Sequence, residues 1–119
     1  MSAVSNFIVT LMNSRNQTHM YHLMTTSYAE HKALEKYYEG IVPLLDSYAE
    51  AYMGTANARV TPRALNVRFK KDPKGMKQYF KDLQARIKKL KLPKESNLKS
   101  IQDDIEVLIK STLYKLTLK

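Results

Sequence analysis

The stretch SYAEHKALEKYYEGIVPLLDSYAEAYMG, residues 27–54, decides the fold. Its apolar and aromatic side chains recur at every third or fourth position, which predicts one long amphipathic helix from Tyr28 to Met53. Ser27 and Glu30 have the spacing of a capping box, so we expect the helix to start there. The stripe along one side of this helix comprises His31, Leu34, Glu35, Tyr38, Val42, Leu45, Ala49 and Tyr52.

Two residues in this stretch are expected to disturb the helix. Pro43 should kink it, because the proline ring removes one backbone donor. Gly54 should end it, since glycine readily adopts the backbone conformation that follows a helix C-terminus.

The same periodicity predicts three further helices outside this stretch. One runs from Ser5 to Met24, one from Asp72-Pro73 to Pro93, and one from a cap at Ser96 or Asn97 to about Leu116. Residues 54–72 form a long connection that either crosses the bundle or holds a short helix near Pro62–Val67.

The lengths of the connections predict the topology. About three residues join the first two helices, and a similarly short turn joins the last two. Each pair should therefore be antiparallel. Two hairpins with one long link between them predict an all-α, four-helix bundle of ferritin-like type with one crossover, a single domain over residues 1–119.

The composition excludes several classes of protein. A chain of 119 residues with 44% hydrophobic residues suits one domain. With no cysteine, it has no disulfide framework, thiolate zinc site or cysteine nucleophile, and we expect the reducing environment of a cytoplasm. No apolar run approaches the ~20 residues needed to span a bilayer, so no membrane partner is expected.

The formal net charge of +9 is unevenly distributed along the chain. Residues 59–94 carry thirteen basic and two acidic residues, whereas residues 28–58 carry two basic and five acidic ones. Such a basic segment favours contact with a polyanion, and a DNA backbone is the first candidate. The candidate DNA-binding residues are Arg68, Lys70, Lys71, Lys74, Lys77, Lys81, Lys88 and Lys89. A solvated lysine-rich helix face is the alternative.

Ionisable residues recur on one side of the long helix. His31 and Glu35 are four residues apart, as are Asp46 and Glu50, and each pair therefore shares a face. The eleven residues from Glu35 to Asp46 return to within ~20° of the same direction. Imidazole with several carboxylates is a ligand set for iron, manganese or zinc.

One metal ion cannot join both pairs within a single chain, because His31 and Asp46 lie ~22 Å apart along a helix. Two copies of the helix packed antiparallel about a two-fold axis would bring His31 and Glu35 of one chain to Asp46 and Glu50 of the other. His22, on the neighbouring helix across the short turn, could complete the site. His19 lies three residues before His22 and could contact it as a supporting residue. Each of these side chains could instead be an ordinary core or surface residue.

The order of His22, His31, Glu35, Asp46 and Glu50 resembles the intersubunit ferroxidase motif of the Dps-like mini-ferritins. In that motif a histidine on the first helix is followed by H-x3-D, ten residues, and D-x3-E on the second. Residues 13–54, NSRNQTHMYHLMTTSYAEHKALEKYYEGIVPLLDSYAEAYMG, and the closing LIKSTLYKLTLK are similar to phage-encoded proteins described as Dps-like.

The resemblance implies a ferritin-like subunit that assembles at least as a two-fold dimer and up to a hollow dodecamer. It implies that iron(II) is bound between subunits, at a centre of one or two irons, and oxidised there, with protection of DNA as a further role. It places the protein in the cytoplasm of an infected host cell or in the virion. The alternative from a different class is a non-enzymatic helical bundle, structural or binding DNA or an acidic protein through its basic face.

Overall fold

Helices account for every regular element in the residues that the structure describes. This computed structural model describes residues 2–61, 63 and 68–118. Its elements are α1 (Ala3–Met24), α2 (Tyr28–Ala56), the short 3-10 helix η1 (Pro73–Gly75), α3 (Met76–Lys88) and α4 (Ser96–Lys115). No strand occurs within those described ranges. The prediction of an all-helical chain with four helices is confirmed.

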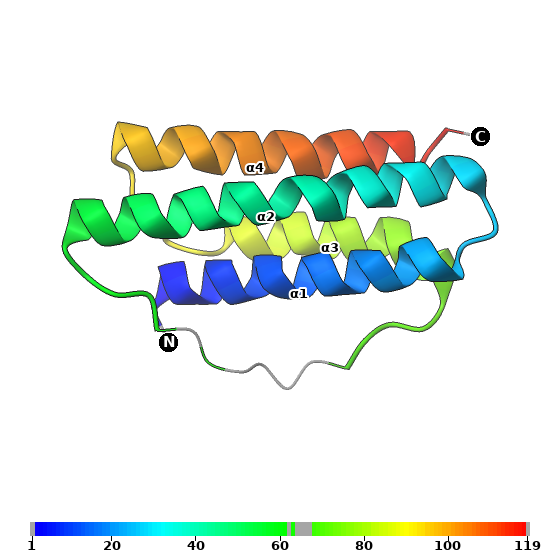
Figure 1. The fold of residues 1–119 in the computed structure, drawn as a ribbon, viewed down its shortest axis with the longest axis horizontal. Helices are drawn as coiled ribbons and strands as arrows, with labels where there is room; N and C mark the ends of the chain where they lie inside the picture. The colour runs from blue at the N-terminus through cyan, green and yellow to red at the C-terminus, as the bar shows by residue number, and fades with distance from the viewer. Residues whose placement is uncertain (1, 62, 64–67, 119) are drawn as a thin grey trace.

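All four helices lie along the long axis of a molecule that measures 45 × 28 × 22 Å (Figure 1). α1 and α2 are antiparallel neighbours, and α3 and α4 form a second antiparallel pair. The chain leaves α2 at one end of the bundle and re-enters α3 at the other, so the described ends of the link between them lie at opposite ends of the molecule (Figure 1). α2 packs against both α1 and α4, and α3 contacts α4 and α1.

The core lies between these helices and is rich in aromatic side chains. Phe7, Tyr37, Tyr48 and Phe80 are almost completely buried and come from three different helices. Ring pairs meet edge to face, with 5.1 Å between the centroids of Phe7 and Tyr48 and 5.0 Å between those of Tyr37 and Phe80. Gly40 allows α2 to approach α4 closely, because a Cβ at this position would lie only 3.3 Å from Leu108.

The link is fastened to α1 at two points. The side-chain amide of Gln17 donates to the carbonyl of Lys70 over 2.9 Å and accepts from the Lys70 N–H over 2.7 Å. Near the other end of the link, the Thr61 N–H donates to Ser5 Oγ. The alternative of a short helix near Pro62–Val67 lies almost wholly outside the described residues.

The ends of α2 differ in detail from the prediction. Ser27 is the N-cap and accepts from the Glu30 N–H, as expected. In a full capping box the Glu30 carboxylate would also accept from the Ser27 N–H. That N–H instead donates to the Thr25 hydroxyl, which donates to the Glu30 carboxylate over 2.6 Å, so this part of the prediction is wrong. α2 continues through Pro43, which is exposed.

Gly54 does not end α2, contrary to the prediction. The helix continues to Ala56, and Asn57 adopts the left-handed conformation that follows it, with φ of 50°. Asparagine tolerates this conformation better than other residues with a side chain, so it can replace glycine after a helix.

The boundaries of the last two helices also required correction. α3 ends at Lys88 rather than at Pro93, because the N–H groups of Lys89 and Leu90 bond to carbonyls three residues earlier and tighten the chain into a turn. α4 begins at Ser96 with Glu95 as its N-cap, so neither Ser96 nor Asn97 caps it. The side-chain amide of Asn97 instead donates to Thr55 Oγ1 near the end of α2.

The described helices were also compared with the dimensions of a bilayer. Over the ranges that the structure covers, none combines the length and the apolar character that a membrane-spanning helix requires.

Candidate metal site at the α1–α2 hairpin

The hairpin between α1 and α2 brings His22 and His31 into direct contact. Their rings stack with 3.6 Å between centroids and 20° between planes. The Nδ1 atom of His22 lies 2.8 Å from the carbonyl oxygen of His31, and Nδ1 of His31 lies 2.9 Å from the carbonyl oxygen of His22. Each imidazole is therefore fastened to the backbone of the other helix.

These two bonds determine which nitrogen of each ring is free. A carbonyl oxygen only accepts hydrogen bonds, so both Nδ1 atoms must carry the proton. In the neutral ring the lone pair then belongs to Nε2, which is the usual state of a histidine that binds a metal. Among the described residues, the buried polar side-chain atoms that lack a hydrogen-bond partner are Thr18 Oγ1 and Tyr21 Oη. The Nε2 atoms of His22 and His31 are not among these buried, unpartnered atoms.

The same bonds stabilise the hairpin itself. His22 lies in the last turn of α1, where carbonyl groups have no partner within the helix. The His31 side chain supplies a donor to one of these carbonyls, and it does so from the first turn of α2. The two hydrogen bonds therefore stabilise the hairpin and fix the positions of the two imidazoles at the same time.

Glu35 lies one helical turn after His31 on α2. Its carboxylate pairs with Lys32 at 3.2 Å, and this hydrogen bond holds the pKa of the Glu35 carboxyl below its usual value. His22 and His31 lie near enough to lower that pKa further. The carboxylate is half-buried and remains charged beside the two imidazoles.

Aromatic and cationic side chains surround the histidine pair. Tyr38 stacks on His19 with 4.4 Å between centroids and meets the His22 ring edge to face at 5.2 Å. The guanidinium of Arg15 lies 5.3 Å from the centre of the Tyr38 ring. The ring centroids of His19 and His22 are 5.9 Å apart. The contact of Arg15 with this group was not predicted, although Arg15 lies four residues before His19 on the same face of α1.

Asp46 and Glu50 lie on α2 away from this group. Both are exposed, and neither belongs to an ion pair among the described residues. Within the described ranges, no group of three or more histidine and acidic residues in one chain has the geometry to hold a metal ion. The chain therefore brings His22 and His31 into contact, but Glu35 does not complete a three-residue metal group with them, and Asp46 and Glu50 lie apart.

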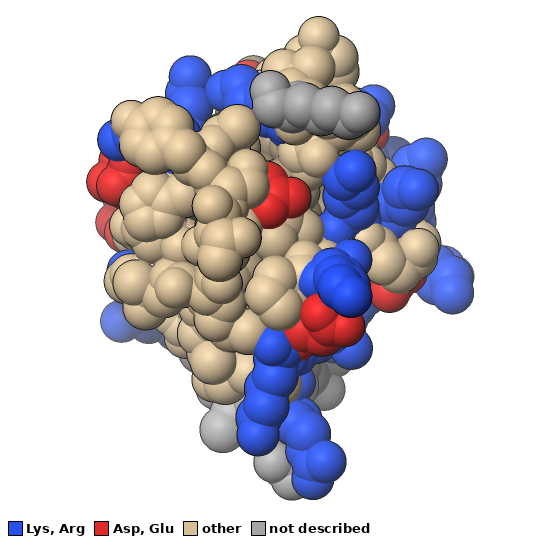
Figure 2. Space-filling model, turned by 90° about the vertical axis from the view of Figure 1, so that its right-hand side faces the viewer, with Lys and Arg blue, Asp and Glu red and all other residues tan. Residues whose placement is uncertain are grey.

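Between the two groups, the exposed residues of α2 include the uncharged Val42, which is 39% exposed, and the acidic Glu39. The four predicted ligands on α2 are placed symmetrically about a point between residues 40 and 41, close to Val42. Figure 2 shows the end of the molecule that holds the hairpin, where a broad area without Lys or Arg lies beside a region in which they gather.

The basic residues of the link and α3 are where the sequence placed them. Arg68, Lys70, Lys71, Lys74, Lys77, Lys81, Lys88 and Lys89 are all exposed. The three ion pairs of the described residues involve Lys32, Lys99 and Lys110, so none of these eight cations is neutralised by an acidic side chain there.

Comparison with known proteins found one sequence family. Residues 22–116 match a family described as a family of unknown function (DUF5856), and this range includes all five predicted metal ligands. No curated protein and no solved structure matches the chain. Because the matched range covers most of its residues, the chain belongs to the DUF5856 family.

Proposed function

We propose that this protein is a Dps-like mini-ferritin subunit that binds and oxidises iron(II) at a site shared by two copies of the chain. His22, His31 and Glu35 of one subunit bind the iron, together with Asp46 and Glu50 of its two-fold partner. The ligand set also admits zinc or manganese, which would compete with iron for the same atoms. The basic face of the link and α3 would hold DNA near the iron-oxidising particle.

The observation that carries the proposal is the reciprocal bonding of the two histidines. Each Nδ1–H donates to a backbone carbonyl, which orients the ring and leaves Nε2 as the free lone pair. Glu35 adds a charged carboxylate within electrostatic reach of both rings. A donor set held rigid in this way loses little entropy when a metal ion binds.

The helix directions support the ferritin-like part of the proposal. Two antiparallel hairpins joined by a link between opposite ends of the bundle correspond to the one-crossover arrangement of ferritin-like bundles (Figure 1). In that arrangement the outward side of α2 can lie against a second copy. The uncharged residue Val42 would then lie near the two-fold axis, with one complete ligand set on each side of it.

The reaction requires the protein to bind iron(II) and to prefer iron(III). Each iron(II) gives up one electron to oxygen or peroxide, and the anionic carboxylates of Glu35, Asp46 and Glu50 favour the ion of higher charge. The imidazoles supply neutral donors, so the site accepts the cation without excess negative charge.

A complementation experiment tests the shared site. His31→Ala removes a ligand from one half-site and Glu50→Ala removes a ligand from the other. Each variant alone should oxidise iron(II) no faster than buffer does. A refolded mixture should regain activity, because mixed dimers contain one intact site made of His31 from one chain and Glu50 from the other.

Asp104→Ala is the matched control, since Asp104 is an exposed acid on α4, outside the ligand set and away from α2's proposed interface. Its iron(II) oxidation, followed by the absorbance of the ferric product, should equal that of the unmodified chain. Two results contradict the proposal: oxidation by either single variant at the unmodified rate, or a mixture as inactive as its components. A native mass of a single chain would also contradict it.

The unpaired cations favour DNA binding as the second activity. Binding to phosphates by exposed lysines is insensitive to base sequence and weakens steeply as salt is raised. Replacing Lys70, Lys71 and Lys74 by Gln should weaken duplex binding by about tenfold or more at moderate salt, since about three phosphate contacts are lost.

The control for this experiment replaces Lys36, Lys110 and Lys115 by Gln, which changes the net charge equally on α2 and α4. Equal loss in both triple variants would show that net charge alone governs the interaction. Binding by the unmodified chain that does not respond to salt would exclude the phosphate backbone as the ligand.

A further inference from the structure

A cavity of about 260 Å³ opens between α3, the turn that follows it and α4, far from the histidine pair. Its floor is apolar and buried, with Phe7 from α1 and both Ile105 and Ile109 from α4. Ile87 and Leu92, which are partly exposed, form its walls. The volume is below the roughly 300–1,000 Å³ of sites for drug-sized ligands, so only a small molecule fits.

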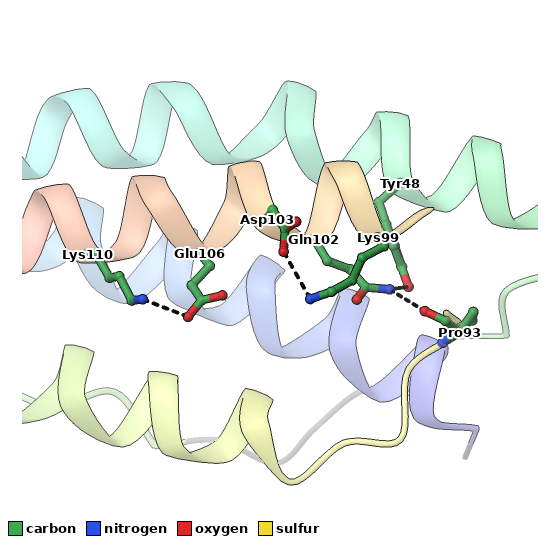
Figure 3. Close-up of polar contacts among 7 residues, drawn as sticks. All are labelled: Tyr48, Pro93, Lys99, Gln102, Asp103, Glu106 and Lys110. Carbon is green, nitrogen blue, oxygen red and sulfur yellow. Dashed lines mark hydrogen bonds and ion pairs between the residues drawn. The ribbon is translucent and has the colours of Figure 1, made fainter. Parts of the chain in front are cut away.

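The rim of this cavity is cationic. Lys88, Lys94 and Lys99 line it together with one acidic residue, Glu106. Glu106 is paired with Lys110 at 3.0 Å, and Lys99 is paired with Asp103 at 3.0 Å (Figure 3). The charges of Lys88, at the end of α3, and Lys94, in the turn that follows, therefore remain without an ion-pair partner among the described residues.

Gln102 holds the wall of the cavity in place. Its amide nitrogen donates to Tyr48 Oη over 2.8 Å and to the carbonyl of Pro93 over 2.9 Å (Figure 3). Because a carbonyl cannot donate, the amide must present its nitrogen to Pro93, and its oxygen is left for other partners. The turn that carries Leu92 and Lys94 is thus connected through Gln102 to Tyr48 on α2.

We propose that this cavity binds a small amphipathic anion, an unbranched carboxylate with a short alkyl chain. The alkyl chain lies on Phe7, Ile105 and Ile109, where burial of apolar surface stabilises it. The carboxylate lies at the rim between the ammonium groups of Lys88 and Lys94, neither of which forms an ion pair within the described part of the chain. Neither a free alcohol nor a short anion satisfies both parts of the site.

Octanoate is the probe that tests this proposal, in a titration followed by NMR of the isoleucine and leucine methyl groups. The methyl signals of Ile87, Ile105 and Ile109 should shift together and saturate, with a Kd of about 1 mM or below for a ligand of this size. Acetate should cause no saturable shift. Octan-1-ol, which has the same alkyl chain without the charge, should bind about tenfold more weakly.

Matched lysine variants separate a specific site from general attraction to a basic protein. Lys88→Gln with Lys94→Gln should weaken octanoate binding by about tenfold. Lys89→Gln with Lys91→Gln removes the same charge from exposed positions that do not line the cavity and should leave the Kd within about twofold.

Three results would overturn the proposal: equal losses in the two double variants, equal affinity for octanoate and octan-1-ol, or methyl shifts confined to other parts of the bundle. None of these measurements depends on iron. The site can therefore fail while the histidine site stands, and the reverse.

Discussion

Tyr37 is completely buried in the bundle, and its hydroxyl lies 2.6 Å from Ser14 Oγ on α1. Ser14 donates its own proton to the carbonyl of Leu11 over 2.7 Å. The tyrosine hydroxyl must therefore be the donor to Ser14. A buried chain of two bonds runs from α2 to the backbone of α1, and its direction is determined by the carbonyl at its end.

This direction predicts an asymmetry between two conservative substitutions. Tyr37→Phe removes a donor but leaves Ser14 bonded to Leu11, so the free energy of unfolding should fall by only about 0.5–1.5 kcal/mol. Ser14→Ala leaves a buried hydroxyl without an acceptor and should cost about 1–3 kcal/mol. Urea unfolding of both variants and of the double variant measures the difference. Equal costs, or a larger cost for Tyr37→Phe, would show that the bond runs the other way.

Burial also predicts how stability changes at high pH. Desolvation raises the pKa of Tyr37 and of Tyr79 well above the ordinary tyrosine value, so both stay protonated in the folded state. Above about pH 10 the unfolded chain loses these protons and the folded chain does not, which favours unfolding. The stabilisation is thus complete below about pH 10 and is lost as the pH rises further.

Urea unfolding between about pH 8 and 11 checks this expectation. The free energy of unfolding should decline above about pH 10 with a steeper slope in the unmodified chain than in Tyr37→Phe, which lacks one of the two groups. Parallel slopes would mean that the Tyr37 hydroxyl titrates normally in the folded protein. Absorbance near 295 nm should show the ionisation of this tyrosine only as the protein unfolds.

At the scale of the elements, the described residues of the link between α2 and α3 depend on α1 for their position. The amide of Gln17 satisfies both the N–H and the carbonyl of Lys70. These two bonds hold an exposed, basic stretch beside α1, where Arg68 and Phe69 line a groove with Thr10 and Asn13. The cationic face proposed to contact DNA is arranged in part by this neutral side chain.

Replacing Gln17 by Leu should release the stretch around Lys70 while the helices stay folded. The volume is similar, both hydrogen bonds are lost, and the freed backbone groups can turn to water, so the loss of stability should stay near 1 kcal/mol. Trypsin should cut at Arg68, Lys70 and Lys71 several-fold faster, as followed by mass spectrometry. Asn13→Ala, one turn earlier on α1, is the control and should not change the cutting rate.

On the scale of the whole molecule, the surfaces differ in charge and in proposed role. The outward side of α2 presents Val42 between two sets of predicted ligands, whereas the described residues of the link and α3 present exposed cations. In Figure 2 the area without Lys or Arg and the basic region lie side by side at one end of the bundle. A dimer formed through α2 would leave the basic side free for DNA.

This arrangement predicts that Val42→Asp abolishes both the dimer and iron(II) oxidation, although it removes no ligand. Near a two-fold axis the new carboxylate would face its own copy, and two like charges in a buried interface repel. Val107→Asp, at a position on α4 that is 64% exposed, should change neither property. Native mass and oxidation rate are the measurements, and an unchanged mass for Val42→Asp would place the interface elsewhere.

The elements of the bundle could be predicted from the sequence because they depend on local physics. The inner residues of α4, such as Leu98 and Ile105, recur with the period of the helix, and Ser27 caps α2 through its own neighbours. The predicted C-terminal ends of α2 and α3 were wrong, because neighbouring residues could each have ended the helix. Asn57 ends α2 in place of Gly54, and α3 ends before Pro93, because both stretches can extend or close a helix at similar cost.

The sequence by itself therefore determined most of the residues that form helices and that His31 and Glu35 share a face. It did not determine the buried side of α2, which contains Tyr37, Ile41 and Tyr48, whereas Val42 of the predicted stripe is exposed. Only the tertiary structure decided that His22 and His31 bond to each other's backbone, that Gln17 holds Lys70, and that a cavity remains between α3 and α4. Helical periodicity repeats every 3.6 residues and can be read along the chain. Contacts between helices depend on how whole side chains interlock across the bundle, and no local spacing encodes that.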